Sequence, residues 1–176
     1  MDNRPKTKVY IDGSNVFHAQ KKLGWLLDWD RVKNYFFQNF DIVECKYYTG
    51  IKDGDEGMKK FLRYLSKTGI IAITKPLKKI FLDKDEQLSK VLKNNFVYKA
   101  NFDVEMTADI LLETKDINEI IIFSGDSDFA YLVRKLKNLG KNVTIYSSRK
   151  TISWELKLEA GKVIFIEDVK DKIAKQ

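Results

Sequence analysis

The sequence has very few of the residues that build covalent cross-links or soft-metal sites. Its 176 residues include one cysteine, Cys45, and one histidine, His18. A single cysteine excludes an internal disulfide and is typical of a reducing compartment. Because these two side chains are the only soft ligands, a zinc site is not expected.

Long hydrophobic runs are also missing. The longest fully apolar runs, such as residues 120–123, contain four residues, whereas a helix that spans a bilayer needs about 20. The N-terminal sequence MDNRPKTKVYIDGSN has no apolar core of the kind found in signal peptides. We therefore expect a cytoplasmic protein with no membrane partner.

The composition is that of a basic globular protein. Hydrophobic residues make up 44% and charged residues 32% of the chain, a mixture typical of a folded domain rather than a disordered segment. The length fits one domain that covers residues 1–176. The net charge of +7 favours a polyanionic partner such as nucleic acid, although a solvated lysine surface would give the same charge.

Apolar, β-rich runs alternate with helical patterns along the chain. We predict six strands, at residues 7–11, 42–48, 70–74, 118–123, 142–146 and 162–166. Helices are predicted between them, at residues 30–40, 58–68, 103–114, 128–139 and 153–160. Residues 75–99 have no clear period and could contain a short hairpin or a helix. The alternation predicts βαβ units and a mostly parallel sheet, which places ligands at the carboxyl ends of the strands.

Aspartates follow two of the predicted strands. Asp12-Gly13-Ser14-Asn15 follows the first strand, and Ser124-Gly125-Asp126-Ser127-Asp128 follows the fourth. Either motif alone could be a turn, with Asp128 as the N-cap of the next helix. Carboxylates from both motifs at one sheet edge would repel each other unless a cation lay among them. Mg²⁺ and Mn²⁺ are the cations that all-oxygen ligands prefer.

A third acidic site lies at the start of the central helix. Asp103 opens the predicted helix, where it could serve as an N-cap, and Asp109 follows six residues later. On a helix these two residues point about 120° apart, so they need not face the same target.

The order of these motifs resembles the NYN branch of the PIN-like nucleases, in particular the LabA-like group. The resemblance rests on YIDGSN, FDVEMTAD and IIIFSGDSDFAYLVRKLKNLGKNV, and extends from Lys8 to about Asp168. It implies a Rossmann-like three-layer α/β/α sandwich with a mostly parallel central sheet, and a metal-dependent nuclease that acts on RNA more often than on DNA. The family's acidic positions correspond to Asp12, Asp103, Asp126 and Asp128, its first-motif asparagine to Asn15, and the second acid of its central helix to Asp109. The chain departs from the family pattern before the central helix, where Lys-Gly-x-Asp is replaced by Lys99-Ala100-Asn101-Phe102-Asp103.

The resulting hypothesis is phosphodiester hydrolysis with Mg²⁺ or Mn²⁺. Asp12 and Asp126 are the first choices for direct metal ligands, with Asp103 and Asp128 completing the set. Asn15 and Ser124 could orient a carboxylate or contact a phosphate. Lys99, Arg149 and Lys150 are candidate contacts to the nucleic-acid backbone, and Arg149 and Lys150 follow a strand end. Whether the chain forms a homodimer is left open.

Three other functions have similar sequence features. A haloacid-dehalogenase-type phosphatase needs a second aspartate two residues after the first, where this chain has Ser14. A response-regulator receiver needs an acidic pair near its start, and that order is not found. The remaining alternative is a PIN-like module that binds nucleic acid or a protein without cleaving it.

Overall fold

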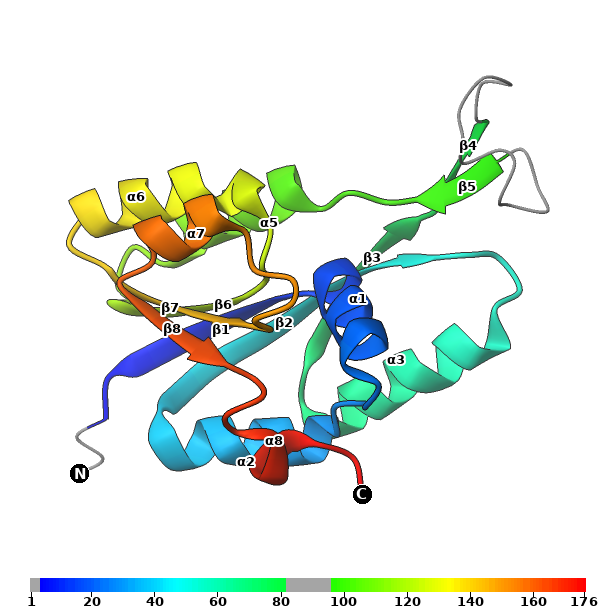
Figure 1. The fold of residues 1–176 in the computed structure, drawn as a ribbon, viewed down its shortest axis with the longest axis horizontal. Coiled ribbons are helices and arrows are strands. Elements are labelled where there is room, and N and C mark those ends of the chain that lie inside the picture. Colours follow the sequence, from blue (N-terminus) through cyan, green and yellow to red (C-terminus); the bar gives the residue numbers. More distant parts are fainter. Residues whose placement is uncertain (1–3, 82–95) are drawn as a thin grey trace.

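The computed structural model describes residues 4–81 and 96–176. Their centre is a six-stranded sheet in the order β3-β2-β1-β6-β7-β8, and every neighbouring pair of strands is parallel (Figure 1). The strands are β1 (Lys6–Asp12), β2 (Asp41–Ile51), β3 (Ile71–Pro76), β6 (Glu119–Phe123), β7 (Asn142–Ser147) and β8 (Lys162–Phe165). This confirms the predicted three-layer α/β fold with a parallel central sheet.

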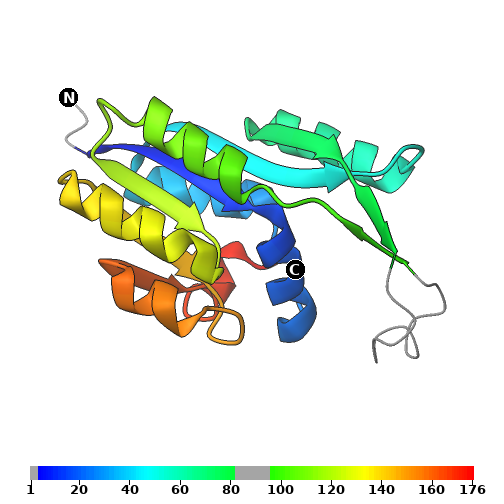
Figure 2. The ribbon, with the colours of Figure 1, turned by 90° about the horizontal axis from the view of Figure 1, so that it is seen from above.

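Helices cover both faces of the sheet, because the central strands are apolar on both sides (Figures 1 and 2). In β1, Val9 and Ile11 belong to one core and Tyr10 to the other. The first face is covered by α1 (Gly13–Leu23), α2 (Trp29–Asn39), α3 (Glu56–Thr68) and α8 (Lys170–Ile173). The second face is covered by α5 (Asp103–Glu113), α6 (Ala130–Asn138) and α7 (Trp154–Glu159).

Helix α1 was not predicted from the sequence, and neither was the short α8. The DGSN motif was considered as a turn, but the chain turns directly from β1 into α1 there. Only a narrow apolar stripe, with Val16 and Ala19 buried, holds α1 on the sheet. Most of its other positions are polar and its Phe17 is exposed, which made the helical period hard to recognise.

The segment 75–99 contains a hairpin, one of the two alternatives considered. Strand β3 ends at Pro76, and β4 (Lys78–Phe81) then pairs antiparallel with β5 (Phe96–Lys99). Residues 82–95 lie outside the described part of the chain. The hairpin extends from the edge of the domain on the side of β3 (Figure 2).

The helices are short compared with the thickness of a membrane. Helix α3, with 13 residues, is the longest of those in the described ranges, against about 20 residues for a bilayer span. No helix within these ranges is long and apolar enough to cross a membrane.

Candidate active site

The two aspartate motifs meet because β1 and β6 are neighbours. The last residue pair between these parallel strands is Ile11 with Phe123, so Asp12 and Ser124 leave the sheet side by side. Parallel strands end at the same edge of a sheet, which brings together residues that are 112 positions apart in the sequence.

Hydrogen bonds lock the two motifs to each other. Asp12 is the N-cap of α1, and its Oδ1 accepts a bond from the Asn15 backbone N–H at 3.0 Å. The Ser124 hydroxyl donates to Asp12 Oδ2 at 2.9 Å, and Ser124 Oγ accepts from the Asp126 N–H at 3.2 Å. Asn15 Oδ1 accepts from the Gly125 N–H at 2.8 Å. Asn15 and Ser124 therefore position the motifs rather than acting as turn residues.

Glycines in both motifs allow this close packing. A Cβ on Gly13 would lie 2.5 Å from the Tyr48 carbonyl oxygen, and one on Gly125 would lie 2.7 Å from the Thr151 carbonyl oxygen. Both contacts are with backbone, which cannot easily move away. The two loops are thus held against β2 and against the segment after β7.

Asp126 and Asp128 are joined by a hydrogen bond that caps a short helical turn. The Asp126 side chain accepts from the Asp128 N–H at 3.1 Å and caps a 3₁₀ turn, η1 (Ser127–Phe129), which precedes α6. The alternative of Asp128 as an N-cap is therefore excluded, because α6 begins two residues later at Ala130 without a side-chain cap. The Asp128 side chain is exposed and free of a capping role.

Asp103 is not an N-cap either. It is the first residue of α5, and the cap position belongs to Phe102, which makes no side-chain cap bond. The Asp103 N–H donates instead to Asn101 Oδ1 at 2.9 Å. The Asp103 carboxylate is therefore not used as an acceptor for its own helix.

The four aspartates influence one another electrostatically. Burial raises the pKa of the Asp12 carboxyl above its ordinary value, and the charge of Asp126 raises it further, against the hydrogen bonds from Asn15 and Ser124. Burial also raises the pKa of Asp103, and the charges of Asp126, Asp12 and Asp128 act in the same direction. The ionised forms of Asp12 and Asp103 are thus less favourable here than in water, first because of burial and then because of the neighbouring carboxylates.

The donor chemistry suits a hard cation, although the side chains do not form a closed ligand set. Among residues 4–81 and 96–176, no three His, Cys, Asp or Glu side chains are close enough together to hold a metal ion. A carboxylate has about four acceptor sites, and the bonds to Asn15 and Ser124 occupy two of those of Asp12. Asp12 therefore keeps acceptor capacity for a cation.

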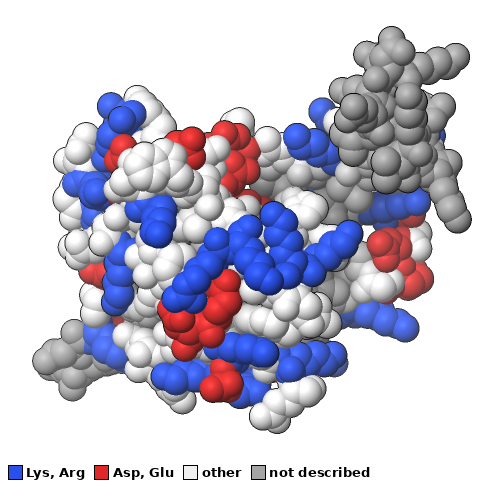
Figure 3. Space-filling view, viewed as in Figure 1, with Lys and Arg blue, Asp and Glu red and all other residues white. Residues whose placement is uncertain are grey.

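The surface around the cluster is divided by charge. Figure 3 shows a band of Lys and Arg side chains across one face, over the region of α1 and the loop after β7 in Figure 1. Acidic side chains lie above this band, towards the N-terminal end of α5, and a second acidic patch lies directly below it. The acidic cluster therefore borders a positively charged surface that attracts polyanions.

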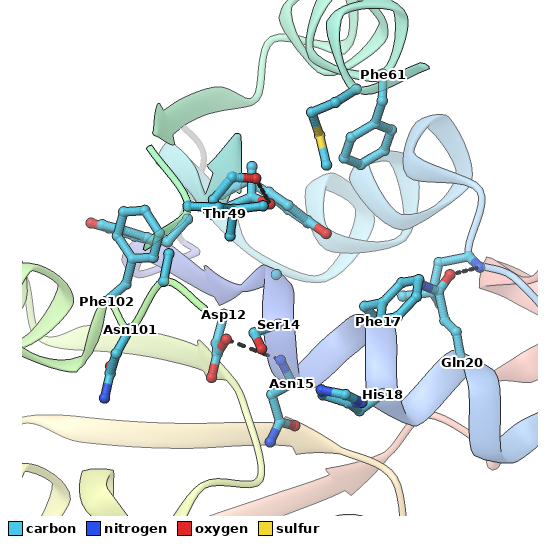
Figure 4. Close-up of a pocket in the computed structure, with 18 of the residues that line it drawn as sticks. Asp12, Ser14, Asn15, Phe17, His18, Gln20, Thr49, Phe61, Asn101 and Phe102 are labelled. Carbon is cyan, nitrogen blue, oxygen red and sulfur yellow. Dashed lines mark hydrogen bonds between the residues drawn. The ribbon is translucent and has the colours of Figure 1, made fainter. Parts of the chain in front are cut away.

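A cavity of about 1280 Å³ contains all four aspartates at its lining. Strand ends, the start of α1 and the start of α5 supply its acidic part, with Asp12 and Asn15 beside Ser14 (Figure 4). Its other part lies between α1 and α3 and is mostly apolar, with Phe17 and Phe61 in Figure 4. One connected space therefore joins the carboxylates to an aromatic compartment.

Comparison with known proteins agrees with this architecture. Residues 6–167 match the family described as the NYN domain. The chain belongs to the NYN domain family. This family is part of the PIN-like nuclease superfamily, and NYN domains are generally nucleases.

One relative and one solved structure show how far the likeness extends. The low amplitude and bright protein LabA of Synechococcus elongatus is 32% identical over 169 residues, which are 95% of this chain and 87% of that protein. A crystal structure of a protein of unknown function from Vibrio parahaemolyticus superposes with a TM-score of 0.78 and covers 98% of both chains. At 23% identity the second likeness shows the shared fold alone.

Of the three basic residues predicted to bind substrate, one lines the cavity of this NYN domain and two do not. Lys99, the last residue of β5, lines the cavity. Arg149 and Lys150 do not: the Arg149 guanidinium pairs with Asp168 at 2.6 Å, and the Lys150 carbonyl accepts from Lys22 Nζ at 3.4 Å. Lys150 therefore lies against the C-terminal part of α1, and Arg149 lies beside Asp168, outside the lining of the cavity.

Asp109, the second acid of the central helix, faces away from the cavity. It accepts a hydrogen bond from the Tyr48 hydroxyl at 2.8 Å and lies 3.4 Å from Lys46 Nζ. Lys46 also pairs with Glu113 in the same network. Asp109 thus joins α5 to β2, as the 120° separation from Asp103 allowed.

Sequence reasoning missed the cavity-lining side of α1. Phe17, His18 and Gln20 all line the cavity, and none of them was among the predicted site residues. The spacing of Val16, Ala19 and Leu23 after an N-cap aspartate was the available signal.

Proposed function

We propose that this NYN domain is a metal-dependent nuclease that hydrolyses phosphodiester bonds, with RNA favoured over DNA. The observation that supports this most is the set of hydrogen bonds between the two strand-end motifs. These bonds hold Asp12 and Asp126 beside one cavity. Hydrogen bonds between Ser124, Asn15 and the opposite motif preorganise an acidic site, which is a common source of catalytic power. Cys45 would stay reduced in the cytoplasm, where we expect the protein to act.

Asp12, Asp103, Asp126 and Asp128 are the residues that would hold Mg²⁺ or Mn²⁺. The raised pKa values of Asp12 and Asp103 support this, because a bound cation would remove the repulsion that causes part of each shift. When bound, such an ion supplies an activated water and polarises the phosphate.

The chain's own residues would position the substrate. Ser124 holds one oxygen of Asp12, and the Asn15 N–H holds the other, so this carboxylate has a fixed orientation. Lys99 at the cavity lining can contact a backbone phosphate, and the basic band in Figure 3 attracts the rest of the strand.

The test compares two aspartates with the same structural role. Asp12 caps α1 by accepting from the Asn15 N–H, and Asp55 caps α3 by accepting from the Met58 N–H at 2.9 Å. Asn and Asp are about equally good N-caps, so Asp12→Asn and Asp55→Asn should both fold. Cleavage of labelled RNA and DNA is measured with Mn²⁺, with Mg²⁺ and with EDTA.

We expect the wild type and Asp55→Asn to cleave only with added metal. Asp12→Asn should lose about 10²-fold or more of this activity, as typically follows loss of an essential electrostatic group. Its binding of nucleic acid should persist, because a repulsive charge near the phosphates has been removed. If the wild type cleaves no substrate, the alternative of a binding module replaces the nuclease; if Asp12→Asn cleaves as fast as Asp55→Asn, the site is misassigned.

A further inference from the structure

The cavity continues well beyond the carboxylates, along one side of α1. Gly13, Phe17 and Gln20 follow one another at helical spacing and all line it. An 11-residue helix is about 16 Å long. The cavity therefore extends from Asp12, at the start of α1, to the segment around Leu26 beyond its end.

The walls of this extension are apolar and aromatic, and two of the large apolar side chains in them are exposed. Phe17 is 61% exposed and Leu26 is 56% exposed, although both line the cavity. Met58 and Phe61 of α3 form the opposite wall and are half-buried, and the buried Tyr47 ring packs edge-on against Phe61 with ring centroids 5.5 Å apart. Large apolar side chains that face a preformed cavity are the usual lining of a ligand site.

The position of these rings relative to the acids suits a strand of nucleic acid. Phe17 lies five residues after Asp12, which is about 7.5 Å along the helix axis. Phosphates of one strand in a duplex are about 3.4 Å apart along its axis. Because 7.5 Å is about two such spacings, a strand that runs along α1 with one phosphate at the carboxylates brings the base of the second nucleotide from that phosphate to the level of Phe17.

We propose that the apolar extension, lined by Phe17, Leu26, Met58 and Phe61, binds an unstacked nucleobase of the substrate strand. This inference rests on the proposed nuclease function and specifies how its substrate is held. Phe17 provides the stacking surface, and every base has a π-face that can use it. The Oε1 atom of Gln20 accepts from the Leu27 N–H at 2.6 Å, which leaves the Gln20 amide N–H groups to meet a base edge. The base must leave its own stack to enter, so an unpaired strand is the form that binds.

Stacking predicts a coupling between one base and one side chain. The substrate is a short single-stranded oligonucleotide with 2-aminopurine or an abasic site moved position by position along it. The variants are Phe17→Ala and the control Tyr131→Ala, because Tyr131 on α6 is 60% exposed and lies outside the cavity. Binding is measured in EDTA by fluorescence, so no cleavage is required.

At one position we expect 2-aminopurine to be quenched by the wild type and by Tyr131→Ala, and an abasic site to weaken binding. Stacking of a base on an aromatic ring contributes about 1–3 kcal/mol, which corresponds to a loss of about 5- to 150-fold. Phe17→Ala should show the same loss with the intact strand, no quenching, and little further loss with the abasic strand.

Equal affinities of Phe17→Ala and Tyr131→Ala, or an abasic penalty that Phe17→Ala retains in full, would overturn the assignment. Because base binding is measured without metal, a failure of cleavage counts against the nuclease proposal and leaves the base subsite to its own test.

Discussion

Ser124 connects the stability of the site to its chemistry, and its hydroxyl can be removed without changing the backbone. The side chain is completely buried. It donates to Asp12 Oδ2 and accepts from the Asp126 N–H, so Ser124→Ala removes a partner from both motifs at once. No larger group is introduced, which limits the effect to these two bonds.

The expected cost follows from the two partners. A hydrogen bond to a charged group contributes about 1.5–3 kcal/mol, and a buried N–H without a partner costs about 1–3 kcal/mol. Asp12 and Asp126 are only partly buried and border the cavity, so water can replace part of each loss. We therefore expect Ser124→Ala to lower the free energy of unfolding by about 2 kcal/mol, or the Tm by about 4–8 °C for a chain of this size.

The same substitution should change the pH dependence of cleavage. The bond from Ser124 stabilises the ionised form and so lowers the pKa of Asp12; its removal raises that pKa further above the ordinary value. More of Asp12 is then protonated at a given acidic pH, and the acidic limb of the rate profile moves to higher pH.

Urea unfolding at pH 7 and metal-dependent cleavage across pH would measure the two effects. Ser127→Ala is the control, because Ser127 belongs to the same motif and is exposed. The two variants could instead have the same free energy of unfolding and the same acidic limb in their pH–rate profiles. In that case the hydrogen bonds assigned to Ser124 do not hold the site together.

Two further predictions concern the same edge of the sheet. Gly125→Ala should destabilise the fold by about 2 kcal/mol or more, since its Cβ would lie 2.7 Å from the Thr151 carbonyl oxygen and 2.8 Å from Ile152 Cα. The control in thermal unfolding is Gly57→Ala, whose Cβ meets only the Asp55 side chain at 3.3 Å. Equal melting temperatures of the two variants would refute the argument. Asp103→Asn should stabilise the metal-free protein at pH 7, because the raised pKa of Asp103 means that its ionised form opposes folding. The gain is about 0.5 kcal/mol, at the low end for surface charge changes because water screens this half-exposed group. It should fade as the pH falls towards about 4 and disappear near pH ~3, where wild-type Asp103 is protonated in the folded and unfolded states alike. A gain that persists there would contradict the electrostatic explanation.

The sequence by itself determined the sheet and the edge at which function was sought. Runs such as residues 120–123 are apolar at every position, as strands covered on both faces must be, and the helical patterns between them predicted parallel pairing. The aspartates after β1 and β6 could be assigned to one sheet edge before any coordinates, because all parallel strands end in the same direction. The resemblance carried by the same motifs predicted the NYN family, which the comparisons confirm.

The tertiary structure decided which side chains actually meet. Whether Asp12 lies beside Ser124 depends on β1 and β6 being neighbours, and strand order is not written in the spacing of either motif. The loop after β7 places Arg149 beside Asp168 and not at the cavity. The orientation of α5 places Asp109 within hydrogen-bond distance of the Tyr48 hydroxyl. Helix α1 is held on the sheet by a few buried residues, so the hydrophobic pattern of this segment was too weak to predict a helix. The aromatic side of the cavity, which Phe17 of this helix lines, was missed for the same reason. Contacts between distant segments depend on the packing of the whole domain, and periodicity within a single segment does not contain that information.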